Sequence, residues 1–131
     1  MIKWFEKYSK ISWVITLFWG VAIFYISSLR FGGVSSALSW VSIVYHFSAF
    51  FCFSFFLLIS SVRGRKNNRI FILVILISVF YGILDELHQF FVPGRACTFF
   101  DVGIDSLGIL FASMIYFIRL KYKSNNSKGF R

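Results

Sequence analysis

The chain has 131 residues, of which 58% are hydrophobic and 19 are phenylalanine, and its formal net charge is +9. A soluble domain of this length could not bury so much apolar surface, and apolar segments of about 20 residues, the length that spans a bilayer, recur along it. The basic residues stand in short clusters between these segments, which is typical of membrane topology signals and argues against a nucleic-acid partner. We expect a single domain, residues 1–131, that forms an all-α polytopic membrane helix bundle.

Four apolar segments define the predicted spans. Residues 1–10 carry three lysines between aromatic residues, which predicts a basic interfacial helix at the membrane surface. The four predicted spans follow at residues 11–29, 38–62, 70–91 and 100–118. A loop is expected at 30–39, and Pro93-Gly94 predicts a tight connection between the third and fourth spans. Residues 119–131 form a basic tail whose polar composition predicts disorder.

The distribution of lysine and arginine predicts the orientation of the spans. Three basic residues precede the first span, four stand between the second and third, and five follow the fourth. The two remaining loops hold one each, Arg30 and Arg95. By the positive-inside rule both termini and the tail are then cytoplasmic, and the loop that carries Arg95 faces outward.

Polar residues within the apolar segments mark the candidate site. Four of the five acidic residues lie between positions 85 and 105, and ionisable groups in membrane-like sequence are costly and usually functional. Counted from the nearest basic loop, polar residues of all four spans lie at one level, roughly 21 to 27 Å above the inner face. We therefore predict one site in the outer leaflet. Its candidate catalytic residues are Asp85, Glu86, His88, Asp101 and Asp105, and its candidate substrate-binding residues are Gln89, Arg95, His46 and Ser27.

The spacing of the charged residues predicts the directions in which their side chains point. Asp101 and Asp105 are about one helical turn apart, so their carboxylates share a face and repel each other unless a cation or a proton lies between them. Arg95 is the expected organiser, because an arginine fork can bridge two carboxylates. Asp85 and Glu86 are adjacent and point about 100° apart, so we expect that they do not both face one partner. We expect both to line the bundle interior, because a charge that faces lipid at this depth is costly. A purely structural ion-pair network around Arg95 is the alternative.

The residue pattern gives little support for a metal site or for a disulfide bond. No standard metal-binding motif is present, so no cofactor is expected. Asp85, His88, Asp101 and Asp105 could nevertheless ligate a hard or borderline divalent ion, which stays open as an alternative. Cys97 is expected in an outward-facing loop, at a different depth from the other cysteine, so a disulfide is not expected.

The polar stretch resembles the signature of the VanZ-like family. The matching residues are Ser27-Ser28, His46-Phe47, Tyr81-Gly82, Asp85-Glu86-x-His88-Gln89, Pro93-Gly94-Arg95, Asp101, Asp105 and Gly108. The sequence departs from the family where relatives often carry a lysine and an aromatic hydroxyl, at Ile43 and Phe50. The resemblance implies a small protein of the bacterial cytoplasmic membrane with a role in the cell envelope. It also implies a link to resistance against teicoplanin, a lipid-tailed glycopeptide.

Three functions stay open at this point. The first is a non-catalytic membrane protein that limits access of lipid-tailed glycopeptides or a related amphiphile. The second is a membrane enzyme that acts on a lipid head group or a lipid-linked precursor, with Asp or Glu as general base and Arg95 holding an anion. The third, a small proton-coupled transporter, is least favoured because the inner half of the spans holds no charge. The expected partners are membrane lipids and such an amphiphile or envelope precursor.

Overall fold

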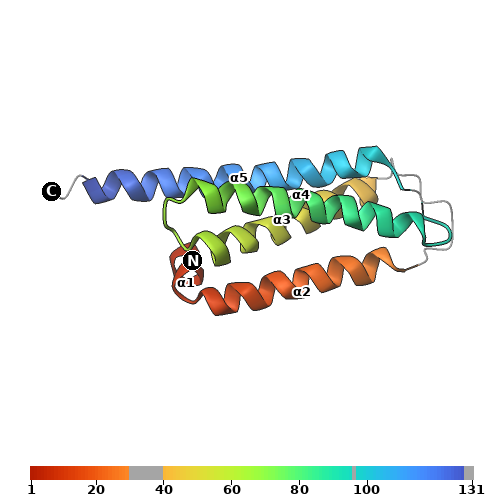
Figure 1. Ribbon diagram of the computed structural model, residues 1–131, viewed down its shortest axis with the longest axis horizontal. Coiled ribbons are helices and arrows are strands. Elements are labelled where there is room, and N and C mark those ends of the chain that lie inside the picture. Colours follow the sequence, from red (N-terminus) through yellow and green to blue (C-terminus); the bar gives the residue numbers. More distant parts are fainter. Residues whose placement is uncertain (30–39, 96, 129–131) are drawn as a thin grey trace.

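The computed structural model describes residues 1–29, 40–95 and 97–128. Within these ranges the chain forms five α-helices and no strand. The helices are α1 (Ile2–Lys7), α2 (Ser9–Ser27), α3 (Trp40–Val62), α4 (Asn68–Phe90) and α5 (Phe99–Lys128) (Figure 1). The last four are long and apolar enough to cross a membrane. The predicted all-α bundle with four spans is therefore confirmed, and the cytoplasmic location of both termini stays a prediction.

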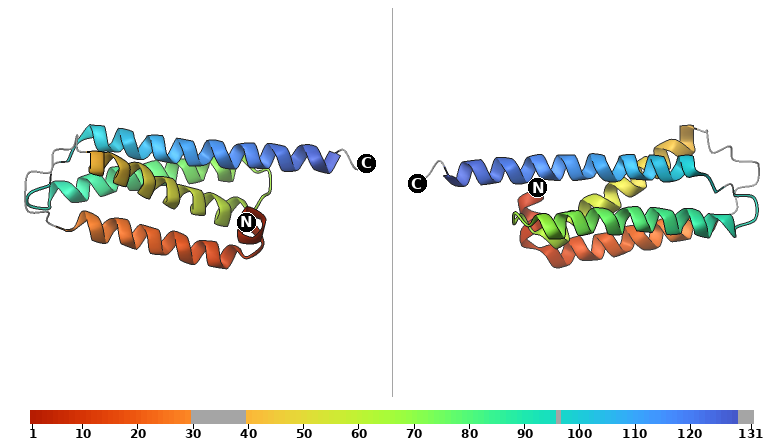
Figure 2. Two further views of the ribbon diagram at one scale, coloured as in Figure 1. Left: turned by 180° about the vertical axis from the view of Figure 1, so that it is seen from behind. Right: turned by 45° about the horizontal axis from the view of Figure 1, so that its top comes forward.

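The four long helices lie alongside one another, and the short α1 folds against one end of the bundle (Figures 1 and 2). Helix α3 contacts every other helix and packs most extensively against α5. Its central position explains why Phe50, Leu58 and Ile59 are fully buried. Large apolar side chains on α2 and α4, such as Phe18 and Leu76, are exposed instead. A helix bundle that is apolar on its outside as well as its inside is typical of a membrane span.

Small residues allow α3 and α5 to approach closely. A Cβ atom at Gly108 would collide with the backbone oxygen of Phe47 and lie 3.1 Å from the backbone nitrogen of Phe51. The backbones of the two helices are therefore in direct contact at Gly108, as small residues permit between membrane helices. This contact brings the first turns of α3 and α5 together at the end of the bundle far from α1.

The boundaries of the helices differ from the predictions at the N- and C-terminal ends. Helix α2 begins at Ser9, two residues before the predicted first span. Helix α5 continues past the predicted end of the fourth span as far as Lys128, so the prediction of a disordered tail is wrong for these residues. The reason is tertiary contact, because two basic residues of this extension bind a buried acid on α1. The loop predicted at 30–39 lies outside the described residues.

Candidate functional site

Buried polar residues from all four spans meet at the end of the bundle far from α1. We term this group the acidic cluster, and it consists of Ser27, His46, Asp85, Glu86, Gln89, Asp101 and Asp105. Each of these side chains belongs to a residue that is at most 4% exposed. The structure thus brings together seven of the nine residues that the sequence predicts for the site, whereas His88 and Arg95 lie at its edge.

Helices α2 and α4 are joined through Asp85. The hydroxyl of Ser27 donates a hydrogen bond of 2.5 Å to Asp85 Oδ1. Gln89 Nε2 donates to Asp85 Oδ2 at 2.9 Å and to Glu86 Oε1 at 3.2 Å. Both acids line the interior, as predicted, but the expectation that they do not face one partner is wrong. Gln89 stands three residues after one acid and four after the other, so its amide lies between them.

Helices α3 and α5 are joined through His46 and Asp105. His46 Nδ1 lies 2.9 Å from Asp105 Oδ1 and 3.8 Å from Glu86 Oε1. The second oxygen of Asp105, Oδ2, is buried and has no hydrogen-bond partner among the described residues. Gly82 on α4 faces this oxygen, because a Cβ atom there would lie 3.3 Å from it. Because Gly82 has no side chain, α4 can pack directly against Asp105 of the histidine–aspartate pair.

Thr98 connects the start of α5 to the cluster, although it was not among the residues predicted from the sequence. Its backbone nitrogen donates to Glu86 Oε2 at 3.2 Å. Its hydroxyl donates to Asp101 Oδ2 at 2.8 Å and accepts from the backbone nitrogen of Asp101 at 3.2 Å. Thr98 therefore caps α5 and orients two acids. The sequence contains a pattern that could have identified Thr98, because Thr-x-x-Asp before an apolar run is close to the capping-box pattern.

His88 and Arg95 lie at the edge of the acidic cluster. His88 is half-buried, its Nε2 is 3.0 Å from Ser28 Oγ, and its ring lies 4.5 Å from the ring of Phe24. Arg95 lies in the connection between α4 and α5, close enough to Asp85 to act on it electrostatically. The role of Arg95 as organiser of the acids stays a prediction.

An apolar groove leads along the bundle to this edge. It has a volume of about 530 Å³ and is lined by α2, α3 and α4, from Trp13 at one end to Phe24 at the other. Tyr81 also lines the groove and donates a hydrogen bond of 2.8 Å to the backbone oxygen of Gly20. Because Tyr81 precedes Asp85 by one helical turn and Phe24 packs on His88, the groove ends beside the acidic cluster.

The acidic cluster has the donor atoms of a cation site. One ligand atom each from His46, Asp85 and Glu86 lie within 4.8 Å of one another. One nitrogen and two carboxylate oxygens suit a borderline divalent ion such as Zn²⁺ or Mn²⁺. This set differs from the predicted one, since His88 faces Ser28 instead. Four carboxylates around one imidazole carry excess negative charge, which protons, a cation or a cationic ligand can balance.

A further buried carboxylate lies at the opposite end of the bundle, and it too was not predicted from the sequence. Glu6 Oε2 is 3.5 Å from an Arg119 nitrogen and 3.6 Å from Lys123 Nζ. Its Oε1 accepts from the Tyr116 hydroxyl at 3.3 Å, and that hydroxyl accepts from the backbone nitrogen of Gly64 at 2.9 Å. We term these five residues the Glu6 cluster. They fix α1 against α5 and the loop between α3 and α4.

Comparison with known proteins identifies the family. The model of the VanZ/LLP1 family matches residues 3–120, which include the first three spans, most of the fourth, the acidic cluster and Glu6. No curated protein and no solved structure matches the chain. The family match agrees with the resemblance seen in the polar stretch between α4 and α5, and it covers nearly the whole sequence. The chain therefore belongs to the VanZ/LLP1 family of membrane-helix proteins.

Proposed function

We propose that this chain is a VanZ-like protein of the bacterial cell envelope that binds a lipid-tailed amphiphile and contributes to resistance against lipoglycopeptides such as teicoplanin. The observation that carries the proposal is the meeting of an apolar groove with an acidic cluster at one end of the bundle. The groove offers a surface for a lipid tail. The edge of the cluster offers a place for the head group.

The length of the groove supports an acyl chain as its occupant. From Trp13 to Phe24 the groove follows α2 over eleven helical steps, a distance of roughly 16 Å along the helix. The hydrocarbon core of a bilayer is about 30 Å thick. The length of the groove thus equals about the thickness of one leaflet, which is the length that one acyl chain occupies.

The charge of the acidic cluster supports a cationic head group. The carboxylates of the cluster outnumber its single imidazole, and the surroundings have a low dielectric constant, so their field extends to the bundle edge. Ser28 is exposed and His88 is half-exposed there, and both offer hydrogen bonds to a ligand. An amine on the head group of the amphiphile would be attracted to this edge. We expect no soluble cofactor.

The distribution of basic residues supports an outward-facing acidic cluster. Of the basic residues whose side chains the structure describes, all but Arg95 lie at the end that holds α1: Lys3, Lys7, Lys10, Arg63, Arg65, Lys66, Arg69, Arg119, Lys121 and Lys123. By the positive-inside rule this end faces the cytoplasm. The acidic cluster would then lie in the outer leaflet of the cytoplasmic membrane, where an extracellular glycopeptide first meets it.

The second candidate is a membrane enzyme that acts on a lipid head group or lipid-linked precursor. The His46–Asp105 pair at 2.9 Å favours it, because a carboxylate that holds an imidazole is a common arrangement in acid–base catalysis. Proton transfer requires contact with the substrate, however, and both residues are at most 2% exposed. Electrostatic attraction of an amine acts over a distance and needs no such contact. We therefore favour binding over catalysis.

Gly20 provides a test of the groove. A Cβ atom there would lie 3.5 Å from the ring of Phe53, an ordinary contact, so Gly20→Ala fits. Gly20→Leu would fill the groove between α2 and α4 without removing any polar group of the acidic cluster. In a susceptible bacterium that expresses the protein, we expect Gly20→Leu to abolish protection against teicoplanin and Gly20→Ala to retain it. Membrane abundance, measured by immunoblot, should be equal for both.

Two further arms of the experiment test the lipid tail and the acidic cluster separately. The protein should give no protection against a glycopeptide that lacks a lipid tail, because such a molecule cannot occupy the groove. Asp85→Asn should lose protection at normal abundance, since it removes a negative charge beside the groove. Equal protection by Gly20→Leu and Gly20→Ala would exclude the groove as the binding site. A stoichiometric divalent metal in the purified protein, with activity lost on its removal, would favour the enzyme instead.

A further inference from the structure

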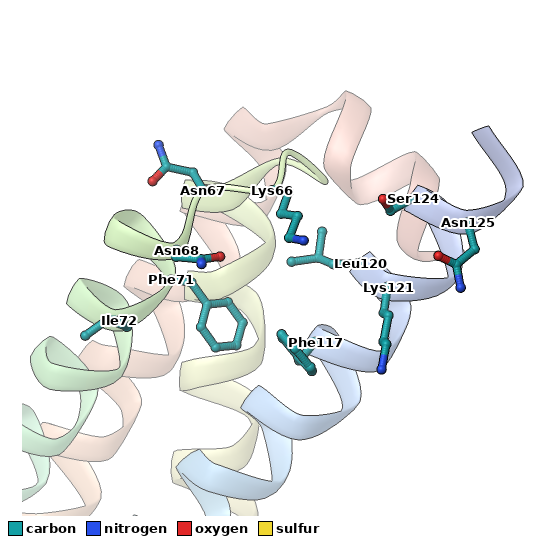
Figure 3. Close-up of a pocket in the computed structure, with 10 residues that line it drawn as sticks. All are labelled: Lys66, Asn67, Asn68, Phe71, Ile72, Phe117, Leu120, Lys121, Ser124 and Asn125. Carbon is teal, nitrogen blue, oxygen red and sulfur yellow. The ribbon is translucent and has the colours of Figure 1, made fainter. Parts of the chain in front are cut away.

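A second pocket lies at the basic end of the bundle, between the start of α4 and the last turns of α5 (Figure 3). Its volume is about 400 Å³. Phe71, Ile72, Phe117 and Leu120 give it an apolar floor, and Lys66 and Lys121 stand among the polar residues around it. The pocket is therefore amphipathic, with its apolar part made by the same helices that cross the membrane.

The two lysines come from separate segments of the chain. Lys66 belongs to the connection between α3 and α4, and Lys121 belongs to α5. Both residues are exposed, and Figure 3 shows the Lys66 side chain extending toward α5 and the Lys121 side chain lying along α5 near Phe117. None of the ten described residues that line the pocket is acidic. The pocket thus carries a charge of about +2 that its own lining does not neutralise.

The position of the pocket corresponds to the boundary between lipid tails and head groups. Phe71 lies in the first turn of α4, three residues after the polar Asn68 that begins this helix. Helix α5 continues beyond the start of α4, so its last turns extend away from the other spans (Figure 1). Phe71 and Phe117 face each other at a ring distance of 6.1 Å. A molecule in this pocket would have an apolar part against these rings and a polar part between the lysines.

We propose that this pocket binds an anionic phospholipid, with its phosphate between Lys66 and Lys121 and one acyl chain against Phe71 and Phe117. Lysine is a common phosphate ligand and acts as a point charge. A soluble phosphate would leave the apolar floor without a partner. A zwitterionic lipid would place its own ammonium group beside two others. The site lies at the opposite end of the bundle from the acidic cluster, so it does not depend on the function proposed above.

The test is lipid binding to the purified full-length protein in detergent, measured by native mass spectrometry. Phosphatidylglycerol and phosphatidylcholine with the same acyl chains are titrated separately. The Lys66→Gln/Lys121→Gln variant removes both charges of the pocket. The Lys10→Gln/Arg65→Gln variant is the matched control, because it removes two exposed charges from the same end of the bundle but none that lines the pocket.

The wild type is expected to bind phosphatidylglycerol more tightly than phosphatidylcholine. The pocket variant should bind phosphatidylglycerol roughly thirtyfold more weakly than the wild type, which corresponds to about 2 kcal/mol for two lysines near an anionic head group. The control variant should bind like the wild type. Equal weakening in both variants, or equal affinity of the wild type for both lipids, would overturn the proposal. Displacement of the lipid by free glycerol phosphate at the same concentration would also overturn it, since the site would then be built for a soluble anion.

Discussion

The two ends of the bundle both bury carboxylates, but they balance the charge differently. At the α1 end the single carboxylate of Glu6 faces two cations, Arg119 and Lys123, and a tyrosine hydroxyl. At the other end, four carboxylates surround His46, with Arg95 at the edge. In the first arrangement the chain itself supplies the cations that face the acid. The second carries excess negative charge whenever its acids are ionised, and such an arrangement is poorly explained by stability alone, since burying unbalanced charge is unfavourable.

The hydrogen bonds of the two clusters also show that the carboxylate of the Glu6 cluster and those of the acidic cluster are paired to different extents. Both oxygens of Glu6 contact donors from α5, although Arg119 Nη2 makes only the 3.5 Å ion pair with Glu6 and no hydrogen bond among the described residues. In the acidic cluster, by contrast, Asp105 Oδ2 and Asp101 Oδ1 are buried without a hydrogen-bond partner among the described residues. Unsatisfied buried acceptors are rare in stable structures and often mark a functional group or an unseen water or ion. The Glu6 cluster therefore serves assembly, and the acidic cluster retains capacity for a proton, a cation or a ligand.

The largest effect is expected where the acidic cluster is held together. A Cβ atom at Gly108 would collide with the backbone oxygen of Phe47, so Gly108→Ala should force α3 away from α5 and separate His46 from Asp105. We expect a loss of stability of about 3 kcal/mol, at the upper end of typical overpacking effects. Thermal unfolding of the purified protein in detergent is the measurement.

Gly103 provides the matched control for this substitution. It lies on the same helix, but a Cβ atom there has no neighbouring atom of the described residues within 4 Å. Gly103→Ala should keep the unfolding temperature or raise it slightly, because alanine favours the helix more than glycine does. If the two variants unfold at the same temperature, the close contact between α3 and α5 is not what holds the cluster.

A medium effect should distinguish the two clusters directly. Glu6→Gln removes the carboxylate that faces Arg119 and Lys123, and we expect it to destabilise the protein by about 2 kcal/mol, less than a fully buried pair because Lys123 is half-exposed. Asp101→Asn removes one of the four carboxylates of the acidic cluster, so the stability of this variant should equal or exceed that of the wild type. Thermal unfolding of both variants under identical conditions tests this contrast. A similar loss of stability in both would mean that the acidic cluster is also a structural ion-pair network.

The smallest effect concerns the thiol beside the acidic cluster. Partial burial raises the pKa of Cys97, and the negative charges of Glu86 and Asp101 raise it further. At neutral pH less of this thiol is therefore ionised than in an ordinary cysteine, so its alkylation by a maleimide should be slow and should accelerate as the pH rises. Rates are measured in a Cys52→Ser background, in which only Cys97 reacts.

Two comparisons complete this experiment. Asp101→Asn removes one of the neighbouring charges and should increase the alkylation rate at neutral pH. On intact cells, a membrane-impermeant reagent should label Cys97, as expected for an acidic cluster at the outer face. Labelling only after lysis would reverse the predicted orientation, and a rate that does not respond to Asp101→Asn would remove the electrostatic link between the thiol and the cluster.

The four spans and the level of the acidic cluster could be predicted because they depend on fixed quantities. The thickness of a bilayer sets the length of a span, and the helical rise converts residue counts into depth. These two quantities were enough to align Ser27, His46, Asp85 and Asp105, which the structure connects by hydrogen bonds. The cost of exposing a charge to lipid also indicated that both acids at positions 85 and 86 line the interior.

The remaining features depend on contacts that no local pattern records. Glu6 stands among lysines at the start of the chain, and its partner Tyr116 is 110 residues away. The composition of the final segment predicts disorder, but its contacts with Glu6 support a helix as far as Lys128. The position of the Gln89 amide between two adjacent acids depends on side-chain torsions. Of the missed residues, only Thr98 had a local signal, its capping pattern.

The Glu6 cluster also bears on the order of events during synthesis. Glu6 precedes the four described spans and is made before them, whereas its partners Arg119 and Lys123 belong to the fourth of these spans and are made after the other three. The carboxylate therefore stays unpaired until α5 has been inserted beside α1. A nascent chain that stalls before this point exposes an uncompensated acid and an unattached helix, which membrane quality-control proteases can recognise. Insertion of α5 would thus supply the partners of Glu6 and also attach α1 to the bundle.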